Sequence, residues 1–146
     1  MVDNLNDEIF VKYLEMIQRV IERMAKNSFQ IKTWTATLFA AIIILTYSII
    51  NILIFIVLFF IISMFWALDS YYLKRERLFR KLYERKVKEF NENSKKIQEL
   101  FTMNVKSYES EVNSIPRLMI STSEILYYIA FIIIIFVFLL VYLTTN

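Results

Sequence analysis

The chain has 146 residues, with 17 lysines and arginines against 14 acidic residues, a net charge of +3 and 58% hydrophobic residues. Soluble domains have roughly 45–50% apolar residues, so the composition favours a membrane protein of one domain at most. The sequence contains no His, Cys or Gly. This absence excludes a zinc site, a thiol nucleophile, a catalytic imidazole, a Walker loop and a dinucleotide fingerprint. We therefore expect no enzymatic activity and no cofactor or metal.

The first segment, residues 1–31, is predicted to form a cytoplasmic amphipathic helix. Its apolar residues recur at steps of 4, 3, 4 and 3, which is the helical period: Phe10, Leu14, Ile17, Ile21 and Met24. Asp7 is the predicted N-cap, because a carboxylate there can accept the free amide protons of the first turn. The helix either serves oligomerisation or the membrane surface, or it packs on the second cytoplasmic helix.

The second segment, residues 32–69, is predicted to form a transmembrane hairpin. Residues 33–68 carry no charged side chain and would extend roughly 54 Å as one helix, whereas a bilayer core needs only about 20 residues. A polar cluster marks the middle of this stretch: Thr46, Tyr47, Ser48 and Asn51. We expect helices near 32–48 and 52–69 joined by a short turn. A single long helix, tilted or buried, is the alternative.

Small residues line one side of the first span at helical spacing, whereas the second span is bulky. In lipid, small residues let helix backbones approach, so this face contacts either a partner helix or an aqueous path. The predicted residues for a pore or for helix packing are Thr33, Thr37, Ala40, Ala41, Thr46, Ser48 and Asn51. Packing alone stays open, because threonine hydroxyls can bond back to the i−4 carbonyl.

The third segment, residues 70–123, is predicted to be a basic cytoplasmic helix followed by a linker. No proline interrupts the chain from Asp69 to about Phe101. A stripe typical of a coiled-coil seam contains Tyr72, Phe79, Tyr83, Val87, Phe90, Ser94, Ile97 and Phe101. Pairs such as Glu76–Arg80 stabilise this helix by roughly 0.2–0.5 kcal/mol each. Residues 102–121, which contain the only proline, Pro116, lead back to the membrane.

Eight basic and two acidic residues lie between Lys74 and Lys88, interleaved with aromatic residues. Two interpretations compete. The first is attraction to anionic lipid, at about 1 kcal/mol per basic residue near the surface. The second is a site for a polyanion, in which basic residues neutralise phosphates and aromatic rings stack on bases. The predicted contacts are Lys74, Arg75, Arg77, Arg80, Lys81, Arg85 and Tyr83.

The last segment, residues 124–146, is predicted to be a third span, because residues 125–143 carry no charge. Five basic residues lie in 1–32 and twelve in 69–124, while the hairpin turn and the C-terminal tail have none. The positive-inside rule therefore places the N-terminus and the central loop in the cytoplasm and the C-terminus outside. The fold class is an all-α membrane protein with three transmembrane helices, a tight N-terminal hairpin plus a C-terminal span.

No ionisable residue is expected at mid-membrane depth, where proton relays and coupled transporters normally carry one. A proton-coupled carrier is therefore disfavoured. A pore in this protein would be neutral, either lined by hydroxyl groups or gated by a hydrophobic constriction.

Five strings carry a resemblance to a known family: YLEMIQ from Tyr13, RMAKNSF from Arg23, KTW at Lys32, FWALDSYYLKRERLFRKLY from Phe65, and FTM at Phe101. They resemble the RipA family of small octameric bacterial membrane proteins, over nearly the whole chain. The segment WxLDxYYLxxERLFR is the most specific part. Family members commonly have Gly where Thr33 and Ser70 stand here, so we expect backbone approach at the two predicted helix ends to differ from the family's.

The resemblance implies a homo-oligomer, octameric in the family, in the bacterial inner membrane and in contact with its lipids. A narrower similarity is to the membrane channel of Hailong-type anti-phage systems, in which a partner nucleotidyltransferase makes a DNA oligomer that controls the channel. The resulting hypothesis is an anti-phage effector, a gated ion channel that depolarises the membrane in response to a nucleotide or oligonucleotide. The alternative is a non-conducting scaffold or stress-response protein that organises lipids or partner proteins. A holin-like lesion former is a third hypothesis.

Overall fold

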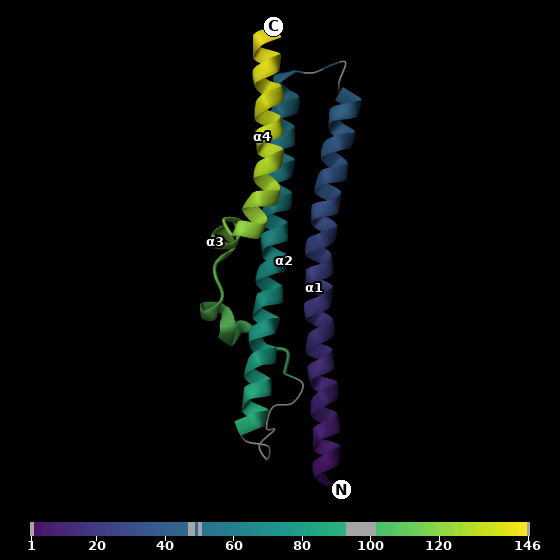
Figure 1. The fold of residues 1–146 in the computed structure, drawn as a ribbon, viewed down its shortest axis with the longest axis vertical. Coiled ribbons are helices and arrows are strands. Elements are labelled where there is room, and N and C mark those ends of the chain that lie inside the picture. The colour runs from purple at the N-terminus through teal and green to yellow at the C-terminus, as the bar shows by residue number, and fades with distance from the viewer. Residues whose placement is uncertain (1, 47–48, 50, 93–101, 146) are drawn as a thin grey trace. The chain divides into compact units, whose positions relative to one another are not determined.

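The computed structural model describes residues 2–46, 49, 51–92 and 102–145, and these residues are helical or irregular throughout. The helices are α1 (Val2–Thr46), α2 (Ile52–Glu92), the 3₁₀ helix η2 (Lys106–Glu111), α3 (Ile115–Met119) and α4 (Thr122–Thr145). Figure 1 draws them in chain order from purple to yellow. The chain forms two compact units, unit 1 (residues 1–26 and 72–113) and unit 2 (residues 27–71 and 114–146).

Both α1 and α2 are longer than the predicted spans. α1 has 45 residues and α2 has 41. Neither contains Gly or Pro, the two residues that most often end a helix, so α1 passes residues 31 and 32 without a break. The prediction of Asp7 as the N-cap is wrong, because α1 begins at Val2.

Unit 1 has a continuous apolar core. Its buried members come from α1, α2 and the segment that precedes η2: Phe10, Tyr13, Ile17, Leu78, Leu82 and Val105. The Phe10 and Phe90 rings stack with centroids 4.1 Å apart. These contacts confirm that the amphipathic faces of the first and second helices pack on each other.

The residues at the centre of this core differ from those predicted. Leu78 and Leu82 are fully buried, whereas Phe79 and Tyr83 from the predicted stripe are only partly buried. The pair Leu78 and Leu82 is offset by one residue, or about 100° around the helix, from the pair Phe79 and Tyr83. Both pairs have helical spacing. Ser94, Ile97 and Phe101 lie outside the described residues.

Residues 102–113, which follow the basic helix, pack on α1 and α2 within unit 1 instead of forming a plain linker. The Tyr13 hydroxyl donates a hydrogen bond of 2.8 Å to the Thr102 carbonyl, and burial raises the pKa of this hydroxyl above its ordinary value. Farther along, Arg85 contacts Glu111 at 3.1 Å and lies over the Tyr108 ring. Unit 1 is therefore held by an apolar centre and by polar contacts at its edge.

Unit 2 contains the apolar parts of α1, α2 and α4. α1 ends at Thr46 and α2 begins at Ile52, which confirms the hairpin and excludes the single long helix. The α1 and α4 segments meet at Phe39 and Phe131, with ring centroids 5.1 Å apart. By length and composition, three helices of the described chain can cross a membrane, and this number of candidate spans agrees with the prediction.

α3 is a short helix just before the third span. It begins with Pro116 in its first turn, where the missing N–H of proline is tolerated. Leu118 is buried, and the Trp66 indole N–H donates to the Met119 carbonyl at 3.1 Å. These contacts attach α3 to the end of the second span within unit 2.

Candidate functional site

The small face of α1, which we define as Thr33, Ala36, Thr37 and Ala40, is exposed in the chain. These positions follow the i, i+3, i+4, i+7 pattern and therefore share one side of the helix. The other side is buried within unit 2, with Ile31 at 3% and Thr35 at 1% exposure. Ala41, the remaining small residue of the prediction, is half-buried at the edge. No described residue of unit 2 therefore covers the small face.

The hydroxyl groups on this face are already hydrogen-bonded to the backbone. Thr33 donates to the Phe29 carbonyl at 3.1 Å, and Thr37 donates to the Thr33 carbonyl at 2.9 Å. Such bonds satisfy a hydroxyl in an apolar environment. The small face therefore presents methyl groups and oxygen lone pairs and leaves no hydroxyl proton without an acceptor.

The polar residues predicted near the hairpin turn serve the helix ends. Thr46 donates to the Ile42 carbonyl at 2.6 Å. Asn51 precedes α2, and its side-chain and main-chain oxygens both accept from the Ile54 amide, which is the action of an N-cap. Ser48 lies outside the described residues. These contacts give Thr46 and Asn51 a structural role that does not require a pore.

The basic segment 74–88 is largely neutralised by carboxylates on unit 1. Five of its eight cationic side chains form ion pairs at 2.8–3.7 Å: Arg80 with Glu76, Lys81 with Glu84, Arg85 with Glu111, Lys86 with Glu89, and Lys88 with Glu92. Three of these acids lie beyond residue 88, so the excess of charge within the run overstates the positive charge of the surface.

Lys74 and Arg77 have no ion-pair partner among the described residues, and both are half-buried. Lys74 lies about 9 Å along the helix from Leu68, the last residue of the uncharged run. This distance suits a cation that reaches the headgroup region. Tyr83 is partly buried against the core of unit 1, so its ring has less free surface for stacking than the sequence predicted.

A groove of about 250 Å³ borders the basic segment on unit 1. Its lining has three cations and two acids together with Val112 and Asn113: Arg77, Arg80, Lys81, Glu84 and Glu111. Because Arg80 and Lys81 each have an acidic partner, Arg77 is the cation of this groove that remains available to an anion.

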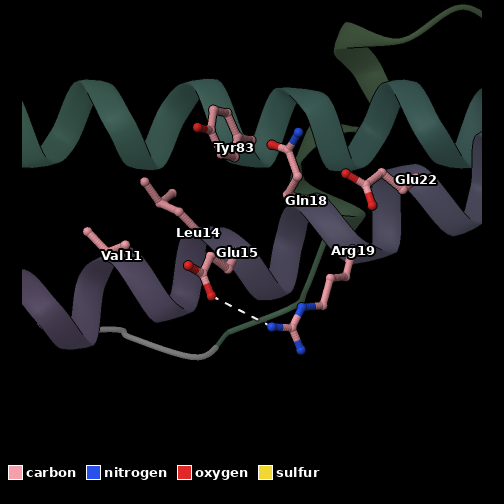
Figure 2. A pocket seen from close by; sticks show the side chains of 7 residues that line it. All are labelled: Val11, Leu14, Glu15, Gln18, Arg19, Glu22 and Tyr83. Atoms are coloured by element: carbon pink, nitrogen blue, oxygen red, sulfur yellow. Dashed lines mark ion pairs between the residues drawn. The ribbon is translucent and has the colours of Figure 1, made fainter.

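A second groove on unit 1, of about 510 Å³, lies between α1 and α2. Figure 2 shows Leu14, Val11 and Tyr83 on its apolar part and the charged side chains of α1 along its rim. Glu15 pairs with Arg19 at 3.7 Å, and Glu22 adds a second acid. The mixed charge at this rim gives no preference for an anion.

A buried polar cluster joins α1, α2 and α4 within unit 2, and the sequence did not predict it. Lys32 of α1 forms ion pairs with Asp69 of α2 and, at 2.9 Å, with Glu124 of α4. Ser28 donates to Asp69 at 2.5 Å and Tyr128 donates to Asp69 at 3.0 Å. Asp69 is 0% and Glu124 2% exposed. In the sequence, the only sign of this cluster is that each of its three charged residues lies at the end of a long uncharged stretch.

Ser70, one of the two positions where members of the resembled family have Gly, is fully buried beside Asp69. Its hydroxyl has no hydrogen-bond partner among the described residues. Thr33, the other such position, lies on the exposed small face. The two departures from the family pattern therefore fall in different environments.

Within the described residues, no group of three or more His, Cys, Asp or Glu side chains could hold a metal ion. No family model, curated protein or solved structure matches the chain. The resemblance to the RipA family stays a prediction that rests on the quoted residues.

Proposed function

We propose that the chain is the subunit of a homo-oligomeric ion channel in the bacterial inner membrane. In this proposal the small face of α1 points toward the axis of the oligomer and surrounds a neutral pore. The resemblance supplies the biological setting, an anti-phage effector that depolarises the membrane when it receives a nucleotide or oligonucleotide made by a partner nucleotidyltransferase.

The observation that carries the proposal is the uncovered small face. Most other exposed apolar residues of unit 2 are large, such as Ile44, Leu45 and Phe60 at 74%, 78% and 68% exposure, and such side chains suit lipid. Small side chains expose more helix backbone and allow a second helix to approach closely. A second copy of the chain supplies such a helix, and a ring of copies encloses a path that their α1 helices line.

Lys74 and Arg77 are the residues that we propose for contact with an anionic signal or with anionic lipid headgroups. Both lie just beyond the second span, and no described acid neutralises them. The other predicted contacts remain secondary candidates. An acid already pairs with Arg80, Lys81 and Arg85, and Tyr83 packs against the core of unit 1. Arg75 is the fifth secondary candidate.

The proposal is tested by recording currents from purified protein in planar bilayers. We expect discrete conductance steps from the natural chain and their loss in Thr37→Leu, because a larger side chain fills the small face. Thr144→Leu is the matched control, since Thr144 is also an exposed threonine, at the end of α4, whose hydroxyl bonds back to the helix, at 2.9 Å from the Val141 carbonyl.

Equal currents from Thr37→Leu and the natural chain would contradict a pore lined by the small face. Currents absent from all three proteins, both alone and after addition of single-stranded DNA oligomers, would contradict a channel with this signal. Thr37→Val distinguishes lining from packing, because it keeps the side-chain volume and removes the hydroxyl oxygen.

The orientation in the membrane is tested with single cysteines, because the chain contains none. We expect Thr144→Cys to react with a membrane-impermeant thiol reagent in spheroplasts. Ser110→Cys, on an exposed position of η2, should react only after the membrane is opened. The opposite pattern would contradict a cytoplasmic central loop.

The second candidate function is a non-conducting membrane scaffold. The ion pairs of the basic segment favour it, because five of eight cations are already neutralised by the chain itself. A scaffold leaves the membrane potential of expressing cells unchanged at every expression level, which a potential-sensitive dye reports.

A further inference from the structure

The polar cluster of unit 2 contains one more acid than base. Its charged members are Lys32, Asp69 and Glu124, and its other polar members are Ser28, Tyr127 and Tyr128. With all three charges present the cluster would carry −1, beside three helices whose outer surfaces are apolar. Ionisable groups in such a place are stable only when they are paired or neutralised.

The donors are shared unevenly between the two carboxyl groups. Asp69 accepts from Ser28 at one oxygen and from Lys32 and Tyr128 at the other. Glu124 accepts from Lys32 through Oε1 alone, while its buried Oε2 has no partner among the described residues. Tyr127 does not supply a donor to this oxygen, because its hydroxyl donates to the Lys32 carbonyl at 2.5 Å. Glu124 is therefore the carboxyl group that has an oxygen without a hydrogen-bond partner.

The Asp69 and Glu124 carboxyl groups lie close together, because both contact the ammonium of Lys32. Two neighbouring ionised carboxylates repel, whereas a proton on one of them removes one negative charge and supplies a hydrogen-bond donor. That proton also reduces the charge of the cluster from −1 to 0. One bound proton thus gives the unpartnered oxygen a hydrogen to donate and removes the excess negative charge.

We propose that this cluster is a proton-binding site, in which Glu124 holds a proton that it shares with Asp69 and that links α4 to α1 and α2. A metal cation is the less suitable occupant, because the ammonium of Lys32 already contacts both carboxyl groups and would repel it. The cluster has only two acids, and the described residues contain no group of three or more His, Cys, Asp or Glu side chains that could hold a metal ion. The inference does not require the protein to conduct ions.

The test uses infrared difference spectra of the full chain in lipid vesicles, the natural protein minus Glu124→Gln. At neutral pH we expect a carboxylic-acid carbonyl band that shifts in D₂O and is absent from the variant. Glu109→Gln is the matched control, because Glu109 lies exposed on η2 of unit 1. Its difference spectrum should contain only ionised carboxylate bands.

A second readout follows from proton linkage. If the folded cluster holds a proton that the unfolded chain releases, the folded state binds more protons, so the folding equilibrium weakens as pH rises through the titration of the cluster, by up to tenfold per pH unit. Glu124→Gln imitates the protonated group and should remove this dependence while keeping the fold. Glu109→Gln should keep it.

A difference spectrum with only ionised carboxylate bands at neutral pH would overturn the proposal. Carboxylate bands that shift when choline is replaced by sodium or potassium would also overturn it, because they would assign the site to an alkali cation. A pH dependence of stability that is unchanged in Glu124→Gln would overturn it as well.

Discussion

Unit 1 and unit 2 are built on the same two helices but place charge and apolar groups in opposite ways. Unit 1 buries side chains such as Ile17 and Leu82 and carries its ion pairs on the surface. Unit 2 exposes Leu45 and Phe60 and buries Asp69. The first arrangement is stable in water, and the second is stable where the solvent is hydrocarbon.

The comparison indicates what holds each unit. The hydrophobic effect needs water outside, so it stabilises the core of unit 1. Unit 2 has apolar side chains that lie against one another or against lipid at little difference in free energy. Its helices are therefore held by close packing and by the Lys32, Asp69 and Glu124 cluster. The same substitution should consequently have different effects in the two units.

The largest effect is expected from Asp69→Ala. This change removes the acceptor of Ser28, Lys32 and Tyr128 and should reduce stability by about 3–5 kcal/mol, the range for breaking a buried ion pair. Thermal unfolding in detergent measures it. Asp69→Asn keeps the volume and leaves Lys32 with Glu124 as its anion, so its loss should be clearly smaller. Equal losses would show that shape and not charge holds unit 2.

Leu82→Ala should destabilise unit 1 by about 2–5 kcal/mol, because Leu82 is 1% exposed and its removal leaves a cavity. Leu45→Ala, at a position 78% exposed in unit 2, is the matched control and should have little effect in detergent. Hydrogen exchange of the amides in unit 1 gives the measurement. A larger loss for Leu45→Ala would reverse the comparison.

Tyr13→Phe isolates one hydrogen bond of unit 1. The Thr102 carbonyl would lose its donor, and we expect a loss of about 1 kcal/mol together with faster proteolysis of the segment from Thr102 to η2. A proteolysis rate equal to that of the natural chain would show that this segment is held by its apolar contacts alone.

The smallest effect is expected from Lys88→Gln, which breaks an exposed ion pair with Glu92. The change in stability should be below about 0.5 kcal/mol.

In vesicles with anionic lipid, Arg77→Gln should weaken binding of single-stranded DNA oligomers more than Lys88→Gln, because Arg77 has no described acidic partner. Equal weakening would contradict the choice of Arg77.

Local pattern was sufficient to predict the three spans, the hairpin and the helix that contains Phe10 and Ile17. It could not select Leu78 and Leu82 over Phe79 and Tyr83, because two lines on one helix can both have the 3.6-residue period. The sequence also carried no signal that would pair Lys32 with Asp69 and Glu124. Each of these residues looked like an ordinary charge at the end of a span, and only the packing of three helices brings them together.

The small face of α1 was predicted from spacing, but only the structure shows that the described residues leave it exposed. Thr35 shows the difference, since it lies in the same stretch as Thr33 and Thr37 and is buried. The proposed partner for this face is a second copy of the chain.

Contact between the small face and another copy of the chain can be detected by cysteine cross-linking in native membranes. The chain has no cysteine, so each variant carries one thiol. We expect Thr37→Cys and Ala40→Cys to form disulfide-linked dimers on mild oxidation, and Leu38→Cys, exposed on another side of α1, to stay monomeric. Dimers from Leu38→Cys and none from the small-face variants would contradict the account.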